Sequence, residues 1–358
     1  MGIAQKHSIN TFAKRRKRGA VVRILLAICL ALAAAWAGYW FIGSGAVKSG
    51  MAAWFDARRA EGWTAEYSDL SVKGFPSRFD TTLTAPHLLD PLSGLGWQAP
   101  FFQLLTLSYT PNHVIAVWPN TQTITSPKGV YTLASTDMRA SLVIAPSTAL
   151  APERATLTAT GVSLAPEDAA PGDTLSMNAL RLAGEHVDGA EARYHLGLAA
   201  EGVAPPATFL TQVEGAGDRP GAMPRVIESV IADLTVDLTA PWDRHALEDA
   251  RPQPTRVDIK QIGATWGAMS LRASGTLDID GTGQPEGRVT IEARGWREML
   301  ALARGAGALT PDMAQTAERA LGMMADGKGA IEVPLRIGEG RVWLGPIPIA
   351  SAPLMRLQ

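Results

Sequence analysis

The stretch MSLRASGTLDIDGTGQPEGRVTIEA, residues 269–293, decides the fold class. Apolar and polar side chains alternate on both sides of a glycine-rich segment at 281–287. A period of two is typical of strands with one buried and one wet face, and the glycine-rich segment between them predicts a hairpin. Parallel strands read instead as continuous apolar runs, so this stretch predicts an antiparallel sheet.

Apolar residues with the same alternation occur elsewhere in the chain. The inward-pointing members of the clearest strands are Phe79, Leu83, Leu234, Val236, Leu238, Met269, Leu271, Leu277, Ile279, Val289 and Ile291. The sequence therefore predicts a mainly β body of the α+β class, with a first β-rich half at 62–215 and a second at 224–358. The segment between the two halves is loose in composition and rich in glycine.

Composition and charge exclude several classes of protein. The chain has 358 residues, of which 46% are hydrophobic and 19% charged, so it is not a disordered chain and can fill about two domain-sized cores. Only one stretch is apolar for long enough to cross a bilayer, which argues against a multi-span transporter. The first 23 residues hold seven basic side chains and no acidic one. The remainder is therefore acidic overall, which argues against nucleic acid as a partner.

Residues 24–42 carry no charge and predict a helix that crosses the bilayer once, because about 20 residues span its ~30 Å hydrocarbon core. The basic cluster at 14–18 stands just before this segment. The positive-inside rule then places 1–23 in the cytoplasm as a basic tail and exports the body. The single cysteine, Cys29, lies within the span, so the exported body has neither disulfide nor thiol chemistry.

Two patterns bear on whether the span is retained. Aromatic rings suit a membrane interface, and four stand at its far end: Trp36, Tyr39, Trp40 and Phe41. The small residues of Ala33-Ala34-Ala35 and Ala35-Trp36-Ala37 also fit a signal-peptidase site. We favour a retained anchor, with cleavage as the alternative.

Helical periodicity appears in two places outside the span. Residues 47–61 predict an amphipathic helix whose narrow apolar stripe packs on the sheet or, alternatively, lies on the bilayer surface. Residues 296–326 predict two helices, the second with Thr310 as its cap and Pro311 at the first helical position.

No catalytic motif is found, so we predict a protein that is not an enzyme, with no catalytic residue, metal or cofactor. One polar constellation mixes oxygen and nitrogen ligands around a turn: Glu185, His186, Asp188, Glu191 and His195. A metal site would need three or four of these side chains to converge. A hairpin turn with solvated side chains is the favoured interpretation.

Gly74-Phe75-Pro76-Ser77-Arg78 predicts a sharp turn. Glycine and proline flank an aromatic ring, and Arg78 opens the next strand. The turn either presents Phe75 to lipid or a partner, or is a structural corner, and we favour the corner.

Four segments carry a resemblance to a known family: GFPSRFD at 74–80, LGWQAPFFQL at 95–104, PNHVIAVWP at 111–119 and GRVWLGPIPIA at 340–350. With the single anchor, they resemble an uncharacterised envelope family of Gram-negative bacteria, a domain of unknown function. Residues 266–287 also look loosely like the carboxy-terminal β segment of AsmA-like envelope proteins. This likeness implies a single-pass protein of the inner membrane, with an elongated, curved sheet in the periplasm whose apolar concave face can hold acyl chains. The chain is too short to bridge two membranes.

Two functions follow as hypotheses. In the first, the apolar residues form a groove for lipid or another apolar envelope molecule, held by burial at roughly 25 cal/mol per Å². In the second, the protein is a structural or assembly factor that contacts other envelope proteins, and its apolar face is ordinary core. The position of the helices at 296–326 distinguishes the two hypotheses. If they cover the apolar face, that face is a closed core, whereas helices at one end of the sheet would leave a groove open.

Overall fold

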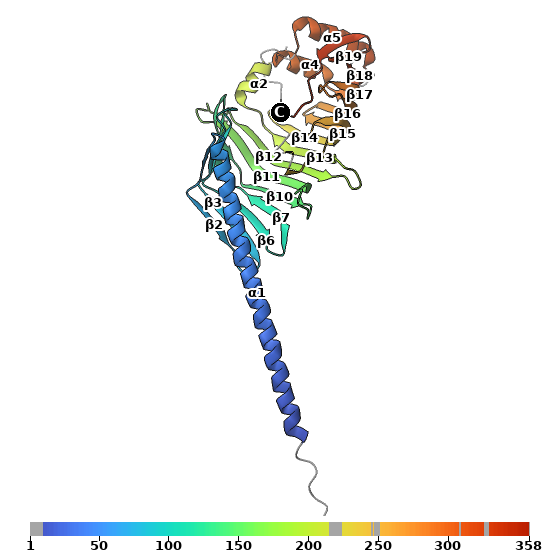
Figure 1. Cartoon of the computed structure of the whole chain (residues 1–358). Helices are drawn as coiled ribbons and strands as arrows, with labels where there is room; N and C mark the ends of the chain where they lie inside the picture. The colour runs from blue at the N-terminus through green and yellow to red at the C-terminus, as the bar shows by residue number, and fades with distance from the viewer. Residues whose placement is uncertain are drawn as a thin grey trace, which may run out of the picture.

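The computed structural model describes residues 10–214, 224–244, 246, 251–307, 309–325 and 329–357. Residues 1–9 of the predicted basic tail, the segment 215–223 between the predicted halves, and residue 326 lie outside the described residues. Figure 1 shows one long N-terminal helix that runs onto a strand-rich body. The predicted mainly β class, with an antiparallel sheet behind an apolar helix, is confirmed.

The elements have the following bounds. The helices are α1 (Asn10–Ala60), α2 (Ala207–Glu214), α4 (Trp296–Gly305) and α5 (Pro311–Met324). The earlier strands are β1 (Thr64–Glu66), β2 (Asp69–Lys73), β3 (Arg78–Thr84), β4 (His87–Leu89), β5 (Gly96–Gln98), β6 (Phe101–Leu107), β7 (Thr110–Val117), β8 (Thr121–Ser126), β9 (Gly129–Ala134) and β10 (Asp137–Ile144). The later strands are β11 (Pro152–Pro166), β12 (Leu175–His186), β13 (Arg193–Val203), β14 (Ile227–Leu238), β15 (Pro254–Trp266), β16 (Met269–Ile279), β17 (Pro285–Arg294), β18 (Ala330–Gly338), β19 (Arg341–Leu344) and β20 (Ile347–Ser351).

The strands form one antiparallel sheet with a side branch. The main path runs β2-β3-β6-β7-β10-β11 and then in chain order to β20. The branch β9-β8-β5-β4-β1 joins the last residues of β11, whose first part pairs with β10. Gly161 lies where β11 changes partner, at φ +56, and a Cβ there would lie 2.9 Å from Cγ2 of Thr136. Glycine therefore allows one strand to serve two neighbours.

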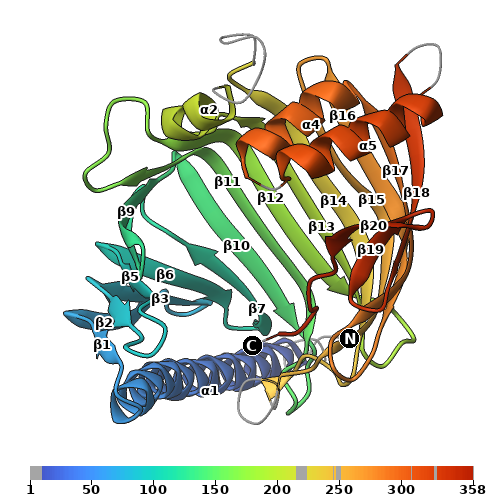
Figure 2. The ribbon, with the colours of Figure 1, turned by 90° about the horizontal axis from the view of Figure 1, so that it is seen from above.

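The sheet is continuous between the two predicted halves. β13 pairs with β14 from Arg193↔Asp237 to Val203↔Ile227, on the two sides of the segment 215–223. In Figure 2 the main sheet is strongly curved, with α1 along one side of the hollow and α2, α4 and α5 along the opposite side. The two sequence halves are therefore parts of one curved layer.

α1 is one unbroken helix of 51 residues, about 76 Å long at 1.5 Å per residue. The predicted anchor 24–42 and the predicted amphipathic helix 47–61 are consecutive parts of it, and Gly43-Ser44-Gly45 causes no break. Its part from Ala20 onward contains a stretch long and apolar enough to cross a membrane, and no part of the described body covers that stretch. The end of the helix packs on the sheet, where Phe55 is buried with Leu70 and Leu83.

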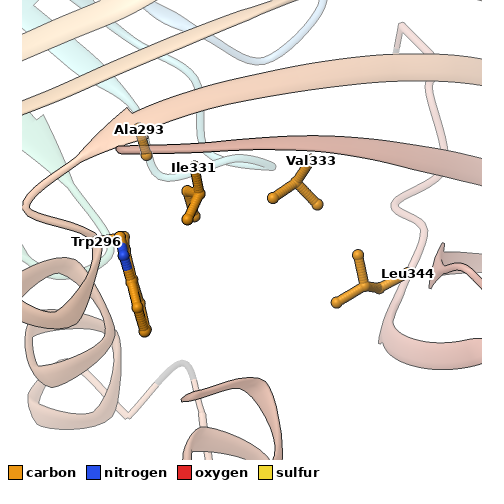
Figure 3. Close-up of a cluster of buried hydrophobic side chains, with 5 residues drawn as sticks. All are labelled: Ala293, Trp296, Ile331, Val333 and Leu344. Carbon is orange, nitrogen blue, oxygen red and sulfur yellow. The ribbon is translucent and has the colours of Figure 1, made fainter. Parts of the chain in front are cut away.

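α4 and α5 pack on the other end of the sheet. Figure 3 shows Trp296 from α4 beside Ala293 and Ile331, and Leu344 near Val333. The α5 cap is as predicted, because the Thr310 hydroxyl accepts a hydrogen bond from the Met313 N–H at 3.3 Å.

Candidate functional site

One face of the main sheet is mainly apolar along its whole length. Residues paired across antiparallel strands lie opposite each other and point to the same face. A row of such pairs crosses the sheet through Phe79, Thr106, Val114, Leu142, Ala155, Gly184, Leu196, Leu234, Ile259, Gly275, Val289, Leu335 and Leu344. A second row on the same face runs through Thr81, Leu104, Ala116, Ala140, Leu157, Leu182, Leu198, Ala232, Ile262, Ala273, Ile291 and Val333. Neither row contains a charged residue.

The apolar face is the inner face of the curve. Phe55 of α1, Trp296 of α4 and Leu354 of the C-terminal segment all lie against residues of this face. The opposite face carries the ion pairs, which include Arg193 with Asp237 and Arg272 with Glu292. The strand alternation therefore separates an apolar inner surface from a charged outer one.

The helices cover the two ends of the inner face and leave its middle open. α1 covers β2 and β3, while α4 and α5 cover β17 and β18. Between these ends, Leu182 and Leu196 are 37% and 39% exposed, and Ile262 and Leu271 are equally accessible. Large apolar side chains of a sheet face are normally buried, so this strip is an open apolar groove.

The C-terminal segment forms one wall of the groove. A cavity of about 560 Å³ lies between its Leu354, Met355 and Leu357 and residues of the six strands β11–β16, among them Leu196 and Val236. The side-chain amide of Gln253 holds the main chain of Leu357, because Nε2 donates to its carbonyl at 3.0 Å and Oε1 accepts from its N–H at 3.0 Å. The segment is therefore fixed by polar contacts, which leaves its apolar side chains to line the cavity.

A second apolar cavity of about 420 Å³ lies at the helical end. α5 lines it with Met313, Ala317 and Leu321, and the sheet lines it with Ile291 and other residues of β17–β20. These volumes are in the range of sites that hold small apolar ligands. The groove can hold an apolar molecule by burial alone, because the surfaces that line it are mainly hydrocarbon.

The structure places all eleven predicted groove residues on the inner face, but in different surroundings. Phe79 and Leu83 lie buried beneath α1, away from the open strip. Leu271 lines the open strip, while Leu234, Val236, Leu238 and Ile291 are half-buried around it. The remaining predicted residues are buried: Met269, Leu277, Ile279 and Val289.

The predicted groove residues include Leu271 but omit three residues of the open strip, Leu182, Leu196 and Ile262. Apolar side chains in β12 occur at both parities, since Met177 and Ala179 precede Leu180 and Leu182. In β15 the register shifts between Ile259 and Ile262, which removes the simple alternation. No single-strand pattern identified Leu182 or Ile262, whereas Leu196 alternates regularly with Tyr194 and Leu198 in β13.

The predicted turn residues hold α1 against the body. The indole N–H groups of Trp36 and Trp40 donate to the carbonyls of Pro76 and Arg78 at 2.9 and 2.7 Å. Phe75 contacts the ring of Trp40, and its own ring is 53% exposed. At Gly74, φ is +104 and a Cβ would lie 2.8 Å from that of Arg78, so glycine is required for the corner.

The polar constellation around the β12–β13 turn is divided between the two faces. His186 points to the inner face beside Tyr194, whereas His195 lies on the outer face. The Asp233 carboxylate accepts a hydrogen bond from Nε2 of His195 at 2.7 Å, and the Glu185 carboxylate lies 3.5 Å from Nδ1 of the same ring. Within the part of the chain that the structure describes, no group of three metal-binding side chains converges.

His195 is expected to titrate above the usual range of histidine. Its pKa is raised, chiefly by the hydrogen bond with Asp233 and further by Glu185. A raised folded-state pKa stabilises the protein fully below the unfolded value of about 6.5, and this contribution disappears as the pH rises through the folded-state pKa. The effect is small because the pair is partly exposed.

The test compares the free energy of unfolding of the full wild-type chain with that of His195→Gln, from a pH below about 6.5 to a pH above the raised folded-state pKa of His195. We expect the wild-type advantage to be largest in acid and to vanish in alkali. An advantage that grew with pH would contradict the assigned partner.

Comparison with curated proteins and with solved structures finds no match. The family described as uncharacterised protein conserved in bacteria (DUF2125) matches residues 40–353. The match begins at Trp40, at the junction of helix and body, and covers every strand of the sheet, since β20 ends at Ser351. The chain therefore belongs to this family of uncharacterised bacterial proteins, DUF2125.

Proposed function

We propose that the protein binds lipid or another apolar component of the cell envelope in the groove on the inner face of its sheet. The observation that carries the proposal is the open strip of Leu182, Leu196, Ile262 and Leu271, four apolar side chains that stay accessible on the inner face of the sheet. An exposed apolar surface of this kind marks a binding site, and acyl chains need no charged partner. The protein acts without catalysis, by burying its ligand.

The placement of α4 and α5 supports this proposal over a closed core. They pack on β17 and β18 through Trp296, Ile331 and Val333 and leave the central strands accessible. The position of these two helices therefore favours an open groove over a closed core. The likeness to AsmA-like proteins stays a prediction, and the curved shape of the sheet is compatible with it.

The proposed place of action is the periplasm, with the chain anchored once in the inner membrane. The uncovered apolar part of α1 supports an anchor, and the basic cluster at 14–18 supports a cytoplasmic amino terminus. The contacts of Trp36 and Trp40 with the body favour retention over cleavage, because cleavage after Ala37 would remove the first of them.

Site-specific photocrosslinking in cells tests the groove. A benzophenone amino acid at position 196 or 182 faces the inner surface, and at position 183 it faces the outer one, within the same protein and the same membrane. We expect lipid adducts at 182 and 196 and none at 183. Equal adducts at 183, or none at 182 and 196, would refute the proposal.

A charge in the groove should remove the ligand. Leu182→Glu places a carboxylate beside the acyl chain, and burying it costs more than the 1.4 kcal/mol that corresponds to a tenfold change. We expect the adduct at 196 to fall by about tenfold or more. Ala183→Glu, one residue away on the outer face, is the control and should leave the adduct unchanged.

A further inference from the structure

Two hairpin turns of the body meet α1 at the end of its span. The first is the β2–β3 turn, which holds Phe75 and Pro76, and the second is the β6–β7 turn at Ser108 and Tyr109. Tyr39 donates from its hydroxyl to the Ser108 carbonyl at 2.6 Å, and Ser108 donates to Pro76 at 3.3 Å. Together with the indole bond of Trp36 to Pro76, these contacts tie both turns to one short stretch of helix.

This stretch lies within the predicted span and not beyond it. Trp36 precedes Ile42 by six residues, about 9 Å along the helix axis. The helix is continuous through both residues, so no linker lets the body move away from the membrane. In Figure 1 the ends of β3 and β6 are the part of the body that reaches furthest along the exposed length of α1.

The two turns expose apolar side chains at this level. Phe75 is 53% exposed and Tyr109 61% exposed, and Leu107 beside it is also exposed. Phe75 lies 5.8 Å, ring to ring, from Phe41, which is itself an exposed residue of the span. The exposed surface of the turns is therefore continuous with the exposed surface of the candidate span.

We propose that these turns form a membrane-contact rim, defined by Phe41, Phe75, Leu107 and Tyr109, that seats the body on the bilayer. The occupant of the rim is the headgroup region of the membrane that α1 crosses. Aromatic rings with an apolar body favour this depth, and the headgroup layer is about 5–7 Å thick on each side of the hydrocarbon core. The rim makes a bilayer contact separate from the span and does not depend on a ligand in the groove.

Lipid-dependent quenching of a site-specific label tests the rim. The full chain, with Cys29→Ala, carries the environment-sensitive label at Tyr109→Cys, a position with a highly exposed side chain that the fold does not need. The protein is placed in phosphatidylcholine vesicles that contain lipids with nitroxide headgroups. We expect the label at 109 to lose most of its fluorescence, and a second label at Phe75→Cys to behave in the same way.

Leu92→Cys is the matched control, because Leu92 is 94% exposed in a loop next to β4, whose partner β1 follows the far end of α1. Its label should keep its fluorescence in the same vesicles. If the labels at 109 and 75 also stay bright, the turns stand clear of the membrane and the rim is free for a protein partner, which overturns the proposal. Equal quenching at 92 overturns it too, since contact would not be specific to the rim.

Discussion

Trp296→Ala is expected to lower the free energy of unfolding by about 3–5 kcal/mol, the usual cost of removing a large buried aromatic side chain. Trp296 is 2% exposed and lies at the centre of the cluster that joins α4 to β18. Its loss leaves a void next to Ile331 and Ala293, and the helical end of the groove loses its support. Urea unfolding of the full chain in mild detergent, followed by circular dichroism, measures the change.

Trp296→Phe separates packing from polarity at the same position. No acceptor for the buried indole N–H of Trp296 is found among the described residues. An unsatisfied buried donor costs about 1–3 kcal/mol, so removing it offsets part of the lost volume. We expect the phenylalanine variant to lie within about 1.5 kcal/mol of wild type. A loss equal to that of the alanine variant would show that the indole group itself is needed.

Trp40→Ala should have an effect of similar size at the opposite end of the molecule, about 3–5 kcal/mol. Trp40 is only 6% exposed; its ring stacks on Phe79, and its N–H donates to Arg78. The variant leaves a buried void and an unpaired carbonyl where the helix meets the sheet. The same urea titration reports the loss, and faster hydrogen exchange in β3 reports its location.

Trp36→Ala is the matched control for this junction. Trp36 also donates a hydrogen bond to a carbonyl of the turn, but it is 40% exposed. The Trp36→Ala variant therefore loses a hydrogen bond worth about 1 kcal/mol and little buried area. If both variants lose the same stability, the junction depends on hydrogen bonds and not on the packing of Trp40.

In strands with a regular alternation, the side-chain pattern was sufficient to predict which residues share a face of the sheet. Leu234, Val236 and Leu238 share the inner face with Val289 and Ile291, as their spacing indicated. The period of a strand is a local property, so the sequence alone shows which side chains of one strand point to the same face of the sheet. Which of them stay accessible depends on where α1, α4 and the C-terminal segment pack, and these contacts join residues far apart in the chain.

The glycines of α1 show why local signals can mislead. Gly43-Ser44-Gly45 suggests an end to the anchor, because glycine weakens a helix. In the structure a Cβ at Gly43 would lie 2.8 Å from Cζ of Phe79, so this glycine lets a strand approach the helix closely. The aromatic residues near it were interpreted as an interface belt, and three of them also donate hydrogen bonds to the body. The packing of α1 on the body therefore explains both the glycines and the aromatic residues near the end of the predicted span.

The unbroken course of α1 bears on how the proposed anchor would respond to bilayer thickness. A span longer than the hydrocarbon layer tilts to fit it, and a flexible hinge would absorb that tilt before it reached an attached domain. In α1 the same continuous helix extends from the apolar candidate span to Phe55, which is buried against the sheet. With α1 as the proposed anchor, we expect a change in bilayer thickness to tilt the whole sheet together with the helix, so that the direction in which its hollow opens depends on the lipid composition.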